Sequence, residues 1–206
     1  MTVTAQNDAT DASNPEPTEA WIVEPVGPLV GDVSVKGSKN AVTKHLVAAL
    51  LGDTPSTISN CPAVGDVDIT VQMLEALGCV VERHNGDTVV DSRNLTSSRV
   101  PLTFSGMNRI PILMIGPLLH AVGEAFVPLV GGDDIGSRPV DFHVDALTKM
   151  GAQITITSEG LEAKATRLRG AHIELPYPSV GATETVLLSA VLAEGRTVLD
   201  GGATEP

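Results

Sequence analysis

The sequence repeats itself at a spacing of about 72 residues, and this repeat constrains the fold more than any other feature. The pattern V-D-x-x-V-x-x-L-x-x-x-G occurs in residues 65–82 and again in residues 138–155. Apolar runs that end in a glycine occur three times, at Gly52, Gly123 and Gly195. Each run precedes a strand-like segment, so these glycines are expected to cap the C-termini of helices. The chain is therefore expected to consist of related structural units.

One unit predicts the order strand, helix, strand, helix and hairpin, which makes it a βαβαββ unit of an α/β (α+β) fold. In the first copy, the expected elements are strands 30–36 and 54–59, helices 40–51 and 66–77, and a hairpin over 79–91. The dipeptide Asn85-Gly86 is typical of a two-residue hairpin turn. The second copy is expected to end in a hairpin over 153–165, and the third to begin with a strand at 171–176.

The third copy is cut short in this sequence. The chain stops at Pro206, whereas the repeat spacing places the start of the next helix at about residue 213. Neighbouring repeats bury each other's apolar faces, so we expect the chain to be incomplete; the alternative is an atypical capping repeat. Residues 1–20 carry four acids and no base, which predicts a disordered tail, with order beginning near Trp21.

Composition excludes several classes of partner. Hydrophobic residues make up 42% of the chain and aromatic residues 2%, so the core is expected to be aliphatic. The net charge of −12 argues against nucleic acid and anionic membrane surfaces as partners. No run is long enough to span a bilayer, and the N-terminus lacks the pattern of a signal peptide. Cys61 and Cys79 have no disulfide or metal spacing, so we expect reduced thiols, no metal site and a cytoplasmic protein.

Three polar corners are expected to precede the first helix of each copy. They are KGSKNA at 36–41, SGMNRIP at 105–111 and PSVGATE at 178–184. Helix N-termini attract anions, and Lys39 and Arg109 add full positive charge at two of the corners. This pattern favours an anionic ligand such as a phosphate or a carboxylate. The alternative is that both side chains are ordinary solvated cations.

A glycine-rich loop, LVGGDDIGSRPVD at 129–141, places two carboxylates side by side. Asp133 and Asp134 stand in this loop, with Arg138 just beyond them. Pro139 suits the first position of the helix that follows. From the residues alone, a solvated acidic loop is the better interpretation.

The motifs GDVSVKGSKNA, GGDDIGSRPVD, PSVGATE and GGATEP resemble the enolpyruvyl transferase family, and the resemblance runs from about residue 21 to residue 206. It implies two domains, each an inside-out α/β barrel-type arrangement of three repeats, with the active site between them. Residues 21–38 would then be a strand region belonging with the missing second domain. Residues 39–206 would be an incomplete first domain, and the missing C-terminal half would be its partner.

The implied reaction transfers the enolpyruvyl group of phosphoenolpyruvate to the 3-hydroxyl of UDP-N-acetylglucosamine, the first committed step of peptidoglycan synthesis, with release of phosphate and no cofactor. The resemblance implies catalytic roles for Lys39 and Asp133. Lys39 and Asn40 match the phosphoenolpyruvate site, and Arg109 matches a contact to ligand phosphate. The segments that match nucleotide-binding stretches are Arg138, Pro139, Val140, Asp141 and Phe142, and then Tyr177, Pro178, Ser179 and Val180.

Asp133 stands where most members of that family have a cysteine that donates a proton to C3 of phosphoenolpyruvate. The donor must be neutral before the step, and a carboxylic acid serves if negative charge or desolvation raises its pKa. Asp134 is expected to face solvent or to cap backbone N–H groups.

Two departures from the family pattern keep alternatives open. Tyr177 replaces a usual lysine, and Leu113 stands where many members have tryptophan. One alternative is an enolpyruvyl transferase that acts on another uridine nucleotide in a secondary-metabolite pathway. The other is a non-catalytic nucleotide-binding half-protein. Because the family takes further catalytic residues from its second domain, the 206-residue chain alone is expected to lack turnover.

Overall fold

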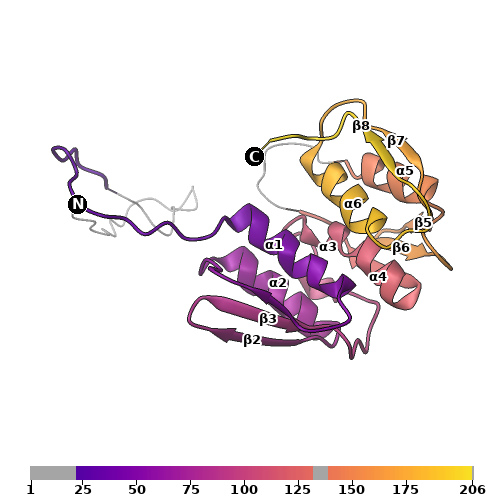
Figure 1. The fold of residues 1–206 in the computed structure, drawn as a ribbon, viewed down its shortest axis with the longest axis horizontal. Helices are drawn as coiled ribbons and strands as arrows, with labels where there is room; N and C mark the ends of the chain where they lie inside the picture. Colours follow the sequence, from indigo (N-terminus) through magenta and orange to yellow (C-terminus); the bar gives the residue numbers. More distant parts are fainter. Residues whose placement is uncertain (1–21, 132–138, 206) are drawn as a thin grey trace, which may run out of the picture. The chain divides into compact units, whose positions relative to one another are not determined.

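The computed structural model describes residues 22–131 and 139–205 (Figure 1). The chain divides into a short first unit, Met1–Val35, and a second unit, Lys36–Pro206. The expected tail 1–20 and Trp21 lie outside the described residues. Residues 22–35 contain no helix or strand, so the predicted strand at 30–36 is wrong for this structure. A strand needs a hydrogen-bonded neighbour, and the described part of this unit provides none. The apolar side chains there are exposed, with Leu29, Val30, Val33 and Val35 between 83% and 98% accessible.

The first repeat follows its prediction closely from residue 39 onward. Its elements are α1 (Lys39–Ala48), the 3₁₀ turn η1 (Ala49–Leu51), β1 (Ser56–Ile58), α2 (Gly65–Ala76), β2 (Val80–His84) and β3 (Asp87–Asp91). The three strands form an antiparallel sheet in the order β1-β3-β2. The hairpin turn is confirmed, because Asn85 and Gly86 both have positive φ, at 52° and 88°.

The second and third repeats reuse the same plan. The second contains η2 (Leu102–Phe104), α3 (Ile110–Leu113), α4 (Ile115–Val122), β4 (Glu124–Pro128), α5 (Asp141–Lys149), β5 (Gln153–Ile156) and β6 (Gly160–Lys164). Its antiparallel sheet has the order β4-β6-β5. The third contains β7 (His172–Glu174), α6 (Val180–Ala190) and β8 (Val198–Asp200), and β7 pairs in parallel with β8. The hairpin expected over 153–165 is confirmed as β5 and β6.

Hydrogen bonds mark the equivalence of the repeats. In each copy, the segment before the first helix lies beside the segment that follows that helix. Gly37 N donates to Asn60 O (3.1 Å) in the first copy, and Val100 N donates to Phe126 O (2.9 Å) in the second. In the third copy, the equivalent contact is the pairing of β7 with β8. The expected glycine caps are only partly correct. Gly123 caps α4 in the left-handed region, with φ of 79°. Gly52 has φ of −83°, because the turn before it is 3₁₀, and α6 already ends at Ala190, before Gly195.

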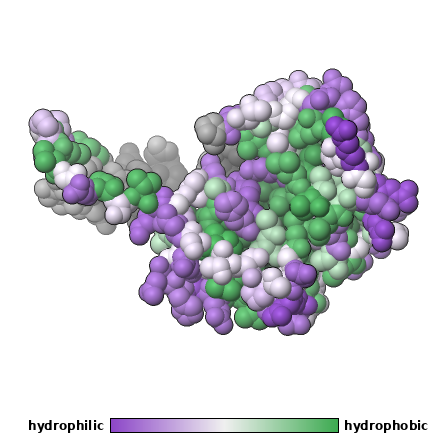
Figure 2. Space-filling model, in the orientation of Figure 1, coloured by the Kyte–Doolittle hydropathy of each residue, from purple (hydrophilic) through white to green (hydrophobic). Residues whose placement is uncertain are grey.

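Within residues 36–206 the helices lie together and the small sheets lie around them, giving a mixed α+β fold (Figure 1). The largest fully buried side chains are aliphatic or Met, as the low aromatic content predicts; they include Leu46, Met73, Leu74, Ile112, Leu118, Leu147 and Leu161. α6 also has an apolar face that is open, with Leu187 60% and Val191 64% exposed, and Figure 2 shows apolar residues gathered over this part of the surface.

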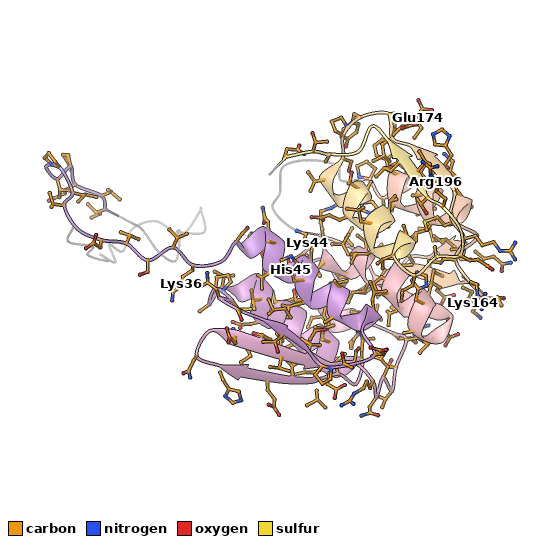
Figure 3. The ribbon with its side chains drawn as sticks, viewed as in Figure 1. Lys36, Lys44, His45, Lys164, Glu174 and Arg196 are labelled. Carbon is orange, nitrogen blue, oxygen red and sulfur yellow. The ribbon has the colours of Figure 1, made fainter. Side chains whose placement is uncertain are left out.

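One half-buried ion pair links the first and third repeats. Lys44 on α1 lies with its Nζ 3.7 Å from Oε1 of Glu184 on α6, and Figure 3 shows Lys44 on its helix. Burial raises the pKa of Glu184, while the charge of Lys44 opposes that rise. The pair therefore ties two helices that are distant in the sequence.

Candidate functional site

All three polar corners lead into helix N-termini, as predicted. Ser38 caps α1 by accepting a hydrogen bond from Ala41 N (3.3 Å), and Ser179 caps α6 by accepting one from Ala182 N (3.4 Å). At the second corner, Asn108 Oδ1 accepts from Ile110 N (3.0 Å) at the start of α3. Side-chain oxygens thus satisfy one backbone donor at each corner.

A pocket of about 240 Å³ gathers most of the segments predicted to bind the nucleotide. We call it the Arg109 pocket; its lining is Arg109, Pro139, Asp141, Phe142, His143, Tyr177, Ser179 and Gly181. The second corner, the start of α5 and the start of α6 contribute these residues. Three segments that are far apart in the sequence therefore meet at one hollow.

Arg109 and Pro139 are joined directly in this pocket. Arg109 Nη2 donates to the Pro139 carbonyl oxygen at 3.3 Å. The expectation that Pro139 occupies the first helical position is wrong, because α5 begins at Asp141 after Val140, whose φ and ψ of −112° and 6° are not helical. With the helix starting later, the Pro139 carbonyl is available to orient the guanidinium.

Two aromatic rings form another part of the wall. Phe142 and Tyr177 meet edge to face, with centroids 5.2 Å apart and an interplanar angle of 66°. Tyr177 is 57% exposed. Aromatic surface beside a guanidinium and the N-terminus of α6 suits a ligand with both a planar base and phosphate groups.

His143 was not predicted from the sequence, although it lines the pocket. Its side chain is buried, at 3% exposure, and Nδ1 lies 2.7 Å from Thr185 Oγ1. Burial lowers the pKa of His143 to about 4; the charge of Arg109 adds to this and Asp141 opposes it. The imidazole is therefore neutral near pH 7. The helical spacing from Val140 to Leu147 could have placed His143 on the buried face of α5.

Lys39 belongs to a neighbouring polar cluster rather than to the pocket lining. Its Nζ lies 3.0 Å from Oδ2 of Asp66, with the two side chains 55% and 30% exposed. Asn108 Nδ2 donates to the other oxygen of Asp66 at 3.4 Å. Asp66 thus joins the first corner to the second, one residue away from Arg109. Neither Asp66 nor Asn108 was predicted, although Asn108 stands inside a corner motif.

The remaining predicted residues are placed as follows. Asn40 is an exposed residue in the first turn of α1, and Val140 is half-buried at the N-cap of α5. Pro178 and Val180 are exposed at the start of α6. Asp133, Asp134 and Arg138 lie outside the described residues.

The two cysteines are buried and free. Burial, together with the nearby charge of Asp91, raises the pKa of Cys79 to about 11. Since the thiolate is the reactive form, Cys79 is a poor nucleophile at neutral pH.

Among the described residues, no group of His, Cys, Asp and Glu side chains is suited to hold a metal ion, and no helix there is long and apolar enough to cross a membrane.

Comparison with known proteins identifies relatives of this chain. The family model described as EPSP synthase (3-phosphoshikimate 1-carboxyvinyltransferase) matches residues 23–206. The UDP-N-acetylglucosamine 1-carboxyvinyltransferase of Chlamydia pneumoniae is 48% identical over 183 residues, which cover 87% of this chain and 40% of that protein. The corresponding protein of Nitratidesulfovibrio vulgaris is 41% identical, over 90% of this chain and 44% of its own length. The chain therefore spans less than half the length of these curated relatives.

Solved structures share the fold. The enolpyruvyl transferase NikO from Streptomyces tendae superposes with a TM-score of 0.71 at 22% identity, covering 83% of this chain and 40% of that chain. EPSP synthase from Acinetobacter baumannii gives a TM-score of 0.67 at 20% identity, covering 85% of this chain and 41% of that one.

Proposed function

Because the chain belongs to the EPSP synthase family of carboxyvinyl transferases, we propose that it forms part of an enzyme that transfers the enolpyruvyl group of phosphoenolpyruvate to the 3-hydroxyl of UDP-N-acetylglucosamine. The observation that carries the proposal is the Arg109 pocket, where a guanidinium, a helix N-terminus and two aromatic rings meet. The names of the curated relatives support this acceptor.

The proposed roles follow the chemistry of the step. The acceptor hydroxyl gives its proton to a general base as its oxygen bonds to C2 of phosphoenolpyruvate and a proton is added to C3. The bond from C2 to the phosphate oxygen then breaks, phosphate leaves, and C3 loses a proton to restore the double bond. Lys39 would hold the phosphoenolpyruvate with Asn40, and Arg109 would contact phosphate. The segments 138–142 and 177–180 would hold the uridine diphosphate. Asp133 would supply the proton, as a carboxylic acid in place of a thiol.

A second acceptor is also supported by one observation. Tyr177 places an aromatic ring, without positive charge, at the edge of the pocket, where the family resemblance leads us to expect lysine. A different uridine nucleotide would then replace UDP-N-acetylglucosamine. Comparing kcat/KM for UDP-N-acetylglucosamine and for other uridine nucleotides in the full-length protein decides between the two.

Lys39 provides the most direct test of the proposed reaction. In the full-length protein, Lys39→Ala should lower kcat/KM for phosphate release by on the order of 100-fold or more, as expected for loss of a preorganised positive charge. The matched control is Lys36→Ala, which removes an exposed lysine three residues earlier and should leave the rate unchanged. A loss of less than about threefold in Lys39→Ala would show that the charge of Lys39 does not take part in the reaction. Absence of phosphate release from the full-length wild type would reject the reaction itself.

A further inference from the structure

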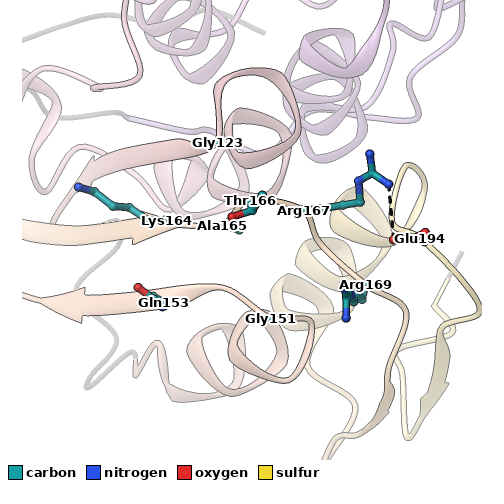
Figure 4. A pocket seen from close by; sticks show the side chains of 9 residues that line it. All are labelled: Gly123, Gly151, Gln153, Lys164, Ala165, Thr166, Arg167, Arg169 and Glu194. Carbon is teal, nitrogen blue, oxygen red and sulfur yellow. Dashed lines mark ion pairs between the residues drawn. The ribbon is translucent and has the colours of Figure 1, made fainter.

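A larger cavity, of about 690 Å³, lies in a different part of the second unit (Figure 4). Of the described residues, those that line it and those that line the Arg109 pocket do not overlap. It lies where α4 and α5 end, at Gly123 and Gly151, beside the connection from β6 to β7. This is the opposite end of α5 from the one that lines the Arg109 pocket.

The β6–β7 connection is fixed by its backbone. Ala165 N donates to Gly123 O (3.0 Å), Arg169 N donates to Met150 O (2.9 Å), and Gly170 N donates to Glu194 O (2.8 Å). The first two bonds satisfy carbonyl groups at the ends of α4 and α5, which would otherwise repel an anion. The side chains of this connection therefore extend from an ordered backbone and are not needed to cap those carbonyls.

Positive charge dominates the lining of this cavity. Its described lining residues include three cations, Lys164, Arg167 and Arg169, and one acid, Glu194. Arg167 Nη1 lies 3.5 Å from Glu194 Oε2, and both side chains are more than half exposed, so this pair is weak. Within the described part of the chain, no ion pair is found for Lys164 or Arg169. In a protein of net charge −12, an excess of cations around one hollow points to an anionic ligand.

We propose that this cavity binds a small, non-aromatic, multiply charged oxyanion, such as a phosphorylated sugar or a tricarboxylate. Guanidinium groups bind phosphate and carboxylate oxygens through paired N–H donors, and Lys164 adds a third point of charge. Among the described residues, no aromatic side chain lines the cavity, so these residues offer no stacking surface for a nucleobase. Its volume is that of a small-molecule site and is larger than a single phosphate requires.

The test is calorimetric titration of the full-length protein with pyrophosphate and with citrate in about 0.15 M salt. Arg169→Gln should weaken binding of the preferred probe about tenfold or more, because it removes a charge-assisted donor. Lys164→Gln, on the exposed end of β6, should also weaken it and serves if the arginine variant folds poorly. Preference for pyrophosphate would assign a phosphorylated ligand, and preference for citrate would assign a carboxylate.

Two controls separate this site from simpler explanations. Lys149→Gln removes a cation from the same end of α5, where Lys149 pairs with Asp145 at 2.8 Å outside the cavity, and it should leave affinity within about twofold. Lys39→Ala should leave unchanged the part of the binding that Arg169→Gln weakens, because any probe bound at the proposed phosphoenolpyruvate site contributes separately. Equal losses in Lys149→Gln and Arg169→Gln would overturn the proposal in favour of general surface charge. Binding that depends on Lys39 but not on Arg169, or no binding by either probe up to on the order of 10 mM, would overturn it as well.

Discussion

His143 has a buried imidazole and lines one wall of the Arg109 pocket. Since its pKa falls from 6.5 to about 4 on folding, the unfolded chain binds a proton between these pH values and the native protein does not. The stability that this difference contributes is complete above pH 6.5 and is lost as the pH falls towards 4. Between pH 7 and pH 5 the loss should be roughly 2 kcal/mol.

Urea unfolding at pH 7 and pH 5 measures this loss. His143→Gln, which retains a hydrogen-bonding group for Thr185, should reduce the pH dependence by about that amount. His45→Gln is the matched control, because His45 is exposed on α1 (Figure 3). An unchanged pH dependence in His143→Gln would show that the native protein takes up the proton as readily as the unfolded chain does.

A second prediction for a single residue concerns Asp133, the proton donor of the proposed reaction. It applies to the full-length protein. Asp133→Asn should lose most turnover, because an amide does not donate a proton near neutral pH, whereas Asp134→Asn should be mild. Asp133→Cys should retain activity and become sensitive to the epoxide fosfomycin, since a thiolate is the stronger nucleophile. Wild type should resist covalent inactivation, which agrees with the burial of Cys61 and Cys79.

Inactivation kinetics with fosfomycin, together with turnover of the two Asn variants, check this assignment. Covalent inactivation of the wild type would contradict it. So would a large loss of turnover in Asp134→Asn accompanied by a small loss in Asp133→Asn.

Among the elements, α4 and α6 pack unusually closely at Gly116. A Cβ atom on Gly116 would lie 2.1 Å from Ser189 Oγ and 3.2 Å from Ser189 Cα. Gly116→Ala should therefore force the helices apart and lower the free energy of unfolding by roughly 1–2 kcal/mol, with the better helix propensity of Ala offsetting part of the strain. Gly65→Ala is the control, because no described residue beyond its own neighbours in the chain and helix lies within 4 Å of its added Cβ at the start of α2. Chemical denaturation of both variants measures the difference, and equal stability would show that the α4–α6 contact adjusts without cost.

The elements also show how far sequence reasoning reaches. The repeat predicted α2, α5 and both hairpins, because helical spacing and turn residues act locally. It failed at 30–36, where strand formation depends on a partner that local sequence does not encode. Pro139 suits a helix start, yet the backbone at Val140 delays α5 by two residues. The family resemblance implied ligand contacts for Arg109 and for Tyr177, and both line one pocket. His143, Asp66 and the cation-lined cavity were not predicted, because their positions depend on tertiary packing.

At the scale of the whole molecule, residues 22–35 and the second unit should differ sharply in protease resistance. Leu29, Val30 and Val33 are 83%, 98% and 87% exposed and lie outside any helix or strand, whereas Leu46 on α1 is fully buried. In the 206-residue chain, thermolysin should therefore cut at these exposed residues before it cuts any helix or strand of the second unit. Mass spectrometry of a time course identifies the first cut. A first cut inside a helix or strand of the second unit would contradict the expected order.

The ion pair between Lys44 and Glu184 has a consequence for synthesis on the ribosome. Most of the chain separates these residues, so α1 emerges long before the helix that contacts this part of it. At ordinary translation rates the interval is on the order of ten seconds, far longer than a helix needs to form. During that time, the part of the α1 surface that contacts α6 in the folded protein remains uncovered. The first repeat is thus exposed to chaperones and to premature association for longer than the repeats that follow it.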